Sequence, residues 1–179
     1  MFVSMIQKRR SIRKFSETKI ETDKMDILVE SALRAPSSMG RNPWEFVFVT
    51  ERDKLTRLSR AKPHGSSFLQ NAALGIVVCA DSEKSDVWIE DASIAAIFLQ
   101  LAAESMGLSS CWIQIRERMH NQTRTAESYV SETLNIPERL KILCIVAMGY
   151  ADEEKAPHRK EELLYEKVHL DGHGNSYRK

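Results

Sequence analysis

The chain of 179 residues has few cysteines and no long apolar run. Its three cysteines, Cys79, Cys111 and Cys144, are an odd number at wide spacing, and each lies in an apolar stretch. This pattern argues against a disulfide framework or a zinc site and predicts buried, reduced thiols. The longest apolar segment, 92–106, is interrupted by polar residues and is too short to span a bilayer.

The chain also has almost no net charge, because its basic and acidic residues leave a formal charge of only +1. No global field therefore draws it to nucleic acid or to an anionic membrane. The first ten residues place apolar side chains before basic ones, the reverse of a signal peptide. With 42% hydrophobic and 28% charged residues, the composition predicts a soluble, cytoplasmic protein folded as a single domain over residues 1–179.

Common catalytic and nucleotide-binding signatures are missing from the sequence. There is no G-x-G-x-x-G, no P-loop, no H-E-x-x-H and no G-x-S-x-G. No cysteine has basic neighbours that would lower its pKa, and the five histidines show neither a triad context nor a zinc spacing. Any chemistry is therefore expected to belong to a bound cofactor, with no metal.

Helical and strand patterns alternate along the chain. Thr22 is predicted as the N-cap of a first helix that ends near Ala35, before Pro36. Buried strands are predicted at 45–50, 74–80, 110–115 and 142–149, and further helices at 53–59, from 85 or 86 to a terminal Gly107, and at 117–134. The helix that contains 92–106 is apolar nearly all round, so it is expected in the middle of the molecule.

From Ala151 onward the chain is polar and charged, with too few apolar residues to form a core of its own. Such a tail is either disordered or laid over another surface. A partner subunit would supply that surface.

A strongly basic run lies near the start, where five of the seven residues 8–14 are Lys or Arg. Several guanidinium groups that converge on one small group suit the binding of a phosphate. The alternatives are a solvated charge run or a nucleic-acid patch, although the near-neutral remainder of the chain speaks against the latter.

Three further segments could form a site. Residues 35–44 place hydroxyls, an amide and a glycine between two prolines, which suits a flat heterocycle or a plain structural loop. Residues 109–115 could present backbone N–H groups to a flavin ring, or could be an ordinary core strand. Residues 157–160 offer a second basic group for the phosphate, or a solvated stretch.

Read in order, RRSIRKF, APSSMGRNPWEFVFV, DASIAAIFLQLAAESMGLSSCWI and MGYADEEKAPHRKEELLYEKV resemble the FMN-dependent nitroreductase family. The likeness runs from about Ile6 to about Val168. It implies an α+β fold with a mixed central sheet wrapped by helices. It also implies an intertwined homodimer in which C-terminal tails are exchanged and two FMN molecules lie at the interface.

The resemblance also implies which residues hold FMN. The early basic segment and a late basic pair would bind the phosphate, one loop would approach the ring from the partner subunit, and a strand end and a second loop would border the ring. These residues are Arg9, Arg10, Ser11, Arg13, Arg159 and Lys160; Pro36, Ser37, Ser38, Met39 and Asn42; and Ile113, Gln114 and His64. Relatives often carry Asn in place of Gly40 and Gln in place of Asn42, and a smaller stretch after Trp112.

The activity implied is the reduction of small acceptors such as nitroaromatics or quinones with NADH or NADPH, in two half-reactions at one site, with no protein residue as acid or base. The sequence leaves three alternatives. These are a flavin-binding sensor or storage protein without reductase activity, a nucleic-acid-binding domain that uses residues 8–14, and a flavin enzyme of different chemistry, such as a dehydrogenase or dehalogenase.

Overall fold

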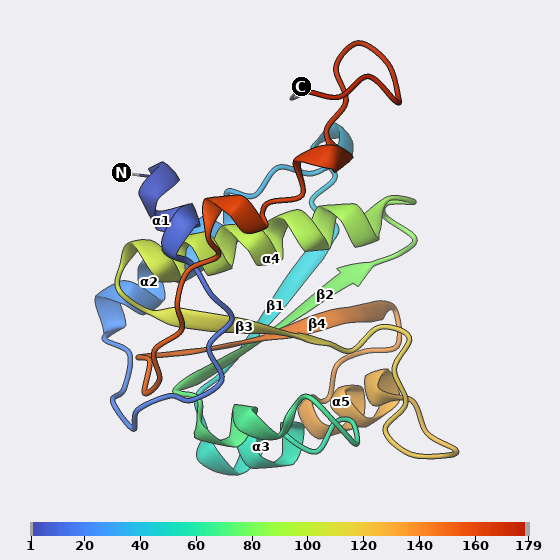
Figure 1. Ribbon diagram of the computed structural model, residues 1–179. Coiled ribbons are helices and arrows are strands. Elements are labelled where there is room, and N and C mark those ends of the chain that lie inside the picture. The colour runs from blue at the N-terminus through green and yellow to red at the C-terminus, as the bar shows by residue number, and fades with distance from the viewer. Residues whose placement is uncertain (1, 178–179) are drawn as a thin grey trace. The chain divides into compact units, whose positions relative to one another are not determined.

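The computed structural model describes residues 2–177 (Figure 1). The helices are α1 (Phe2–Lys8), α2 (Thr22–Leu33), α3 (Arg52–Leu58), α4 (Trp88–Ser105) and α5 (Ala126–Leu134). The strands are β1 (Trp44–Val49), β2 (Leu74–Asp81), β3 (Ser109–Gln114) and β4 (Leu140–Gly149). Short 3₁₀ segments are η1 (Ser38–Gly40), η2 (Ser67–Asn71), η3 (Lys160–Glu162) and η4 (Tyr165–Lys167).

The chain divides into two compact units. Arg10–Lys155 form the larger unit, which holds the sheet and four of the helices, and Met1–Arg9 with Ala156–Lys179 form the smaller one. The smaller unit contains α1, η3 and η4, and four apolar side chains of the tail are about half exposed: Leu163, Leu164, Val168 and Leu170. The single domain expected from the sequence stays a prediction.

The four strands form one sheet in the order β1-β2-β4-β3, and every pair of neighbours is antiparallel. This differs from the mixed sheet expected from the resemblance. Helix α4 does carry the chain from β2 to a parallel strand, β3, but β4 lies between these two strands. Parallel pairing within residues 2–177 is confined to an isolated bridge between Ser11 and Ser110.

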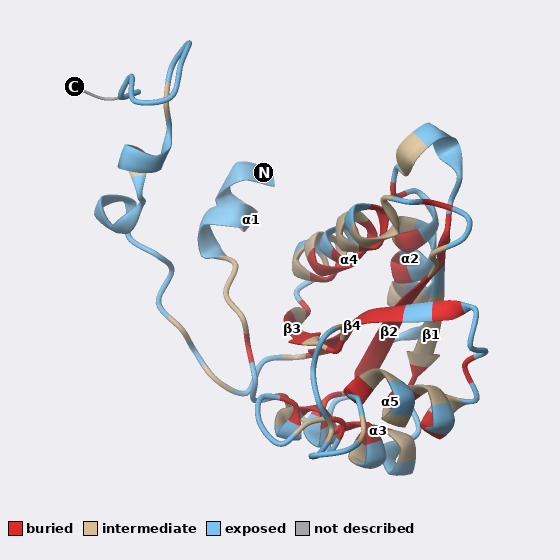
Figure 2. Ribbon diagram, turned by 90° about the vertical axis from the view of Figure 1, so that its right-hand side faces the viewer, coloured by how far each residue is buried: buried red, intermediate tan, exposed pale blue. Residues whose placement is uncertain are grey.

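The alternation of side chains along the strands divides the core in two. In β2, Val77 and Cys79 face the layer that contains α3 and α5, whereas Ile76 and Val78 face α2 and α4. Figure 2 shows buried residues concentrated in the strands and on the sheet-facing sides of these helices. All four predicted strands are confirmed to within two residues at each end.

Helix α4 ends as the sequence predicts. Gly107 has a φ of 77°, its N–H donates to Glu104 O at 3.2 Å, and Leu108 N–H donates to Ala103 O at 2.9 Å. This is the Schellman arrangement, in which a left-handed glycine closes the last turn. The expectation that α4 lies in the middle of the molecule is only partly met, because Ile97 and Phe98 are 40% and 37% exposed.

Two predicted helix boundaries are wrong. The N-cap of α2 is Glu21, and Thr22 is already helical. The helix predicted from residue 117 begins only at Ala126, because the Thr125 side chain caps it by accepting from Ser128 N–H at 3.1 Å. Ahead of it, the Asn121 side chain accepts from the N–H groups of Thr123 and Arg124, both at 2.9 Å, which holds a turn in place of a helix.

The three cysteines are buried and free, as expected. Burial raises the pKa of Cys79 to about 12 and raises the pKa of Cys144 well above its ordinary value. Both side chains therefore stay protonated thiols at neutral pH, and thiols react as thiolates. We expect no alkylation by iodoacetamide at Cys79 or Cys144 in the folded protein at pH 8 and complete alkylation in denaturant, as read by intact mass. Rapid modification of either residue in the folded protein would contradict this.

Within residues 2–177, no helix is both long and apolar enough to cross a membrane. The same residues contain no cluster of three or more side chains of the kinds that hold a metal ion.

Candidate functional site

The basic run predicted to hold a phosphate lies along the free edge of β3. Ser11 forms its parallel bridge with Ser110, and Ile12 N–H donates to Ser110 O at 3.1 Å. Ile12 and Phe15 are buried in the core that faces α3 and α5. Arg13, between them, is exposed. The apolar residues therefore anchor the backbone and leave the guanidinium group at the surface.

The segment after β4 fixes the backbone of this run. Glu153 Oε1 accepts from the N–H groups of Arg13 at 2.6 Å and Lys14 at 3.2 Å. Lys155 Nζ pairs with the same carboxylate at 3.1 Å and donates to Ser11 O at 2.7 Å. The hydrogen bond from Arg13 N–H, aided by Lys155, holds the pKa of Glu153 below its ordinary value of 4.5. The sequence analysis missed this clamp, because nothing in the local pattern pairs residues about 140 positions apart.

Arg9 and Arg10 fall on either side of the boundary between the two units. Arg10 is half-buried. Arg9 N–H donates to Met5 O at 2.9 Å, and its Nη1 atom is buried without a hydrogen-bond partner among the described residues. A buried donor without an acceptor is unfavourable, and a phosphate oxygen would satisfy it.

Beyond Ser110, β3 presents an open edge. Because Ser110 O points away from β4 toward Ile12, strand alternation turns the backbone N–H groups of Trp112 and Gln114 the same way. These donors lie on the edge that the basic run borders. Backbone donors of this kind suit the rim of a heterocycle and can stabilise a negative charge that develops on it.

The side chains of this stretch are engaged within the protein. Ile113 is only 1% exposed and belongs to the core. The Gln114 amide accepts from Trp112 Nε1 and donates to Arg116 O, both at 2.9 Å. Gln114 is therefore placed to act on a ligand through its backbone N–H more than through its side chain, whereas the backbone of Ile113 faces β4.

The loop that the resemblance matches to the flavin ring has a strained backbone. Met39, Gly40 and Asn42 have φ values of 52°, 66° and 47°. A positive φ is uncommon outside glycine and is often found at functional sites. Ser37 Oγ donates to Asn42 Oδ1 and accepts from Asn42 N–H, both at 2.8 Å, which holds the turn closed. Pro36 and Met39 are exposed, with Met39 at 85%.

A buried carboxylate that the sequence analysis missed ties this loop to α4. Asp91, in the first turn of α4, is 2% exposed. Its Oδ1 atom accepts from Ser38 N–H at 2.7 Å, and its Oδ2 atom accepts from Ser85 Oγ at 2.9 Å. Arg41 pairs with Asp86 at 3.1 Å on the same side. The sequence signal for Asp91 was only that it is one of two adjacent acids, with Glu90, in the first turn of an apolar helix.

Within one chain, this loop and the basic run are far apart. The loop is tied to the first turn of α4, whereas β3 begins after its last turn, and the 18 residues of α4 span about 27 Å. The loop also leads into β1 at one edge of the sheet, and β3 is the opposite edge, roughly 14 Å away (Figure 1). The basic run and loop 36–42 of one chain therefore do not lie side by side.

The other predicted residues lie elsewhere. His64 is exposed on the loop between α3 and η2. Arg159 and Lys160 belong to the smaller unit and are exposed. Arg159 Nε bonds to Glu162 Oε1 at 2.8 Å, and its side chain is 75% exposed.

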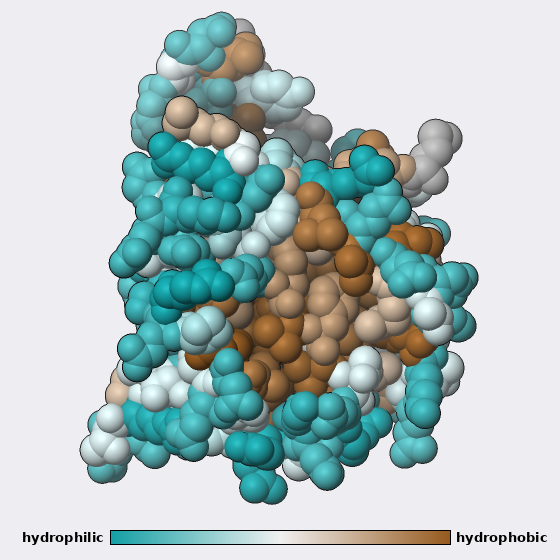
Figure 3. Space-filling model, turned by 180° about the vertical axis from the view of Figure 1, so that it is seen from behind, coloured by the Kyte–Doolittle hydropathy of each residue, from teal (hydrophilic) through white to brown (hydrophobic). Residues whose placement is uncertain are grey.

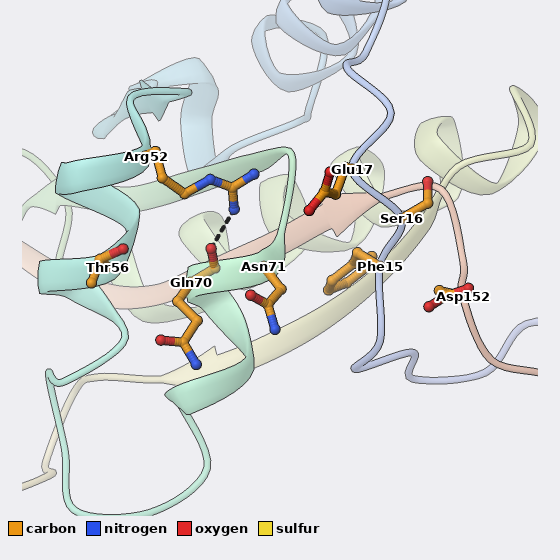
Figure 4. A pocket seen from close by; sticks show the side chains of 8 residues that line it. All are labelled: Phe15, Ser16, Glu17, Arg52, Thr56, Gln70, Asn71 and Asp152. Carbon is orange, nitrogen blue, oxygen red and sulfur yellow. Dashed lines mark hydrogen bonds between the residues drawn. The ribbon is translucent and has the colours of Figure 1, made fainter.

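An open cavity of about 680 Å³ is lined by residues that follow the basic run, by α3 and by the end of η2 (Figure 4). In Figure 4 the Arg52 guanidinium donates to the backbone carbonyl of Gln70. The lining residues are Phe15, Ser16, Glu17, Arg52, Thr56, Gln70, Asn71 and Asp152. None of the residues predicted to hold a cofactor is among them, so this cavity is not assigned to the site.

Comparison with known proteins identifies the family. The model of the nitroreductase family matches residues 6–64 and 56–150, which is most of the chain. The chain belongs to the nitroreductase family.

Individual relatives agree with this assignment. An FMN-dependent nitroreductase from Clostridium difficile R20291 is 46% identical, with a TM-score of 0.93 over 95% of this chain and 99% of that one. An NADPH:FMN oxidoreductase from Vibrio harveyi, solved in complex with NAD+, is 25% identical, with a TM-score of 0.78 over 96% of this chain and 77% of that one. An FMN reductase (NADPH) from Bacillus subtilis is 26% identical over 198 aligned positions, covering 98% of this chain and 74% of that protein.

Proposed function

We propose that this protein is an FMN-dependent oxidoreductase that uses NADH or NADPH to reduce small acceptors such as nitroaromatics or quinones. Bound FMN would take up a hydride from the nicotinamide and pass it to the acceptor, in two half-reactions at one site. The observation that carries the proposal is the basic run clamped against the open edge of β3, which puts phosphate-binding groups beside a row of backbone donors.

In this proposal the chain's own residues bind and orient FMN. Arg10, Ser11 and Arg13 hold the phosphate, and the backbone N–H groups of Trp112 and Gln114 border the ring. For Ile113 the assignment rests on the family resemblance. Arg9 lies in the smaller unit, and its assignment to the phosphate rests on the family resemblance. For Arg159, Lys160 and His64 the assignment rests on the family resemblance.

The proposal includes a homodimer, because each chain carries the two parts of the site at separate places. Loop 36–42 would complete the site of the partner subunit, since it is too far from the basic run of its own chain. The exchange of C-terminal tails belongs to the same proposal, and it is supported by the half-exposed apolar side chains of the tail.

Exposed apolar surface supports this dimer. Helices α2 and α4 pack together, yet they leave large apolar side chains at the surface: Ile27, Val29, Leu33, Ile97 and Phe98. Figure 3 shows a broad apolar area on one side of the chain, framed by hydrophilic residues. Soluble proteins that act as monomers rarely expose contiguous apolar patches of large size, so such surface favours an association site.

The test is direct. The purified protein is expected to show the visible spectrum of bound flavin, to lose it when NADH or NADPH is added without oxygen, and to regain it with a nitroaromatic acceptor. A protein that gains no flavin spectrum in excess FMN would contradict the proposal. Bound flavin that neither nicotinamide reduces would favour the flavin-binding protein without reductase activity.

The clamp at Glu153 gives a prediction of its own. In Glu153→Gln the charge that holds the Arg13 and Lys14 backbone is lost, so we expect FMN to bind about three- to tenfold more weakly at pH 7. In the wild type the lowered pKa keeps this carboxylate ionised, and its effect is lost only as the pH falls below about 4.5. The measurement is an FMN fluorescence titration, with the exposed neighbour Glu154→Gln as the matched control. Equal affinity in the two variants would show that the clamp does not position the site.

A further inference from the structure

A second open cavity, of about 400 Å³, lies between the end of α3, the following loop and the turn after β3. Its lining is polar and contains no carboxylate. The lining residues are Ser59, Arg60, Lys62, Pro63, Ser67, Gln70 and His120. Nothing in the proposed function uses it.

The cations of this cavity are not neutralised. Within residues 2–177, neither Arg60 nor Lys62 takes part in an ion pair. A third cation, Arg118, lies close enough to Lys62 to influence it. Burial lowers the pKa of Lys62, and the charge of Arg118 lowers it further. Like charges held together without counter-charges are unfavourable, and a bound anion would relieve this.

The ring of His120, in the same wall, is held in place by two contacts. Its Nδ1 atom lies 2.9 Å from Arg60 O. A carbonyl can only accept, so Nδ1 carries the proton and Nε2 is left for another partner. The imidazole also stacks on Tyr129, with ring centroids 4.1 Å apart and an angle of 14° between the planes.

A neighbouring residue in the sequence connects this cavity to the proposed flavin site. Ser67, in its wall, precedes Phe68, and the guanidinium of Arg13 lies 5.8 Å from the centre of the Phe68 ring. Lys62 is also influenced by Cys111 of β3, which places its ammonium group near the strand whose edge borders the site. A substrate that reacts at the flavin and extends outward would meet these cations.

We propose that Arg60 and Lys62, in the cavity wall beside His120, form a subsite for an anionic group, a phosphate or a carboxylate, on the molecule that exchanges electrons with the flavin. The role of this subsite rests on the proposed function, but the binding of an anion to it can be measured without catalytic turnover. Two sources could supply the anion: the 2′-phosphate of NADPH, or a carboxylate on the acceptor. The subsite selects anionic partners over neutral ones of the same shape.

The test uses the FMN-loaded protein and two matched pairs of probes, with binding measured by calorimetry. These pairs are 2′,5′-ADP against 5′-AMP, and 4-nitrobenzoate against 4-nitrobenzyl alcohol. The variants are Lys62→Gln and Arg60→Gln, with Lys62→Arg to restore the charge. Lys84→Gln is the control, since Lys84 is exposed and lies beyond the far end of β2. FMN content and the melting temperature confirm that each variant is folded and loaded.

We expect the wild type to prefer one anionic probe over its neutral or less charged counterpart. Lys62→Gln and Arg60→Gln should each weaken that probe by about tenfold, while Lys62→Arg restores binding and Lys84→Gln changes nothing. An effect confined to 2′,5′-ADP identifies the nicotinamide phosphate, and one confined to 4-nitrobenzoate identifies an acidic acceptor. Equal binding of both anions by the wild type and the two neutral variants overturns the subsite. Absence of bound flavin would instead count against the proposed function, so the two failures are distinguishable.

Discussion

Replacement of Arg10 and Arg13 together by alanine is expected to weaken FMN binding by about 100-fold or more and to yield a colourless protein. Both guanidinium groups lie on a segment whose backbone is held against β3 and by Glu153, so the fold fixes where they start. The fold should persist, because the residues of this segment that enter the core are Ile12 and Phe15. The measurement is flavin content after purification, followed by titration with FMN.

The matched control is Arg34→Ala, which removes an exposed guanidinium that pairs with Glu30 of α2. It should bind FMN like the wild type. The conservative variant with lysine at positions 10 and 13 should recover part of the affinity, since lysine keeps the charge but not the planar fork. If the double alanine variant retains wild-type affinity, the phosphate does not lie at the basic run.

The second large effect concerns the dimer. Ile97→Glu combined with Phe98→Glu places two charges on the exposed apolar side of α4, and we expect the protein to sediment as a monomer and to lose FMN. The loss of FMN follows from the separation of the site's two parts, because an isolated subunit lacks the partner's loop 36–42. Both side chains are already more than one-third exposed, so the fold of the single chain should survive, as far-UV circular dichroism would show.

Ser128→Glu on α5 serves as the control, because it adds an exposed negative charge on the opposite face of the sheet. It should stay dimeric and yellow. A double glutamate variant that is monomeric yet binds FMN as tightly as the wild type would show that each subunit forms a complete site. A variant that stays dimeric would place the interface elsewhere.

The sequence predicted local features better than long-range ones. The four strands and the glycine end of α4 follow from apolar runs and from a residue type that tolerates a positive φ, and both are readable from neighbouring residues. The starts of α2 and α5 were misjudged. At α5 the hydrogen bond to the Thr125 side chain fixes the first turn, and apolar periodicity alone does not reveal it.

The site divides in the same way. The basic run stands out in the sequence because five cations fall within seven residues. Its support does not stand out, because Glu153 reaches it from a segment about 140 residues away. Asp91 and Lys62 were missed for a related reason, since their significance lies in burial and in neighbours that only the folded chain brings together.

The central claim, an FMN enzyme whose site is shared by two subunits, is tested most directly by sedimentation velocity followed at the visible absorbance of the flavin. The account predicts that all protein-bound flavin sediments with a species of twice the chain mass of 20.5 kDa. Flavin that sediments with the single chain, or protein that carries none in excess FMN, would contradict it.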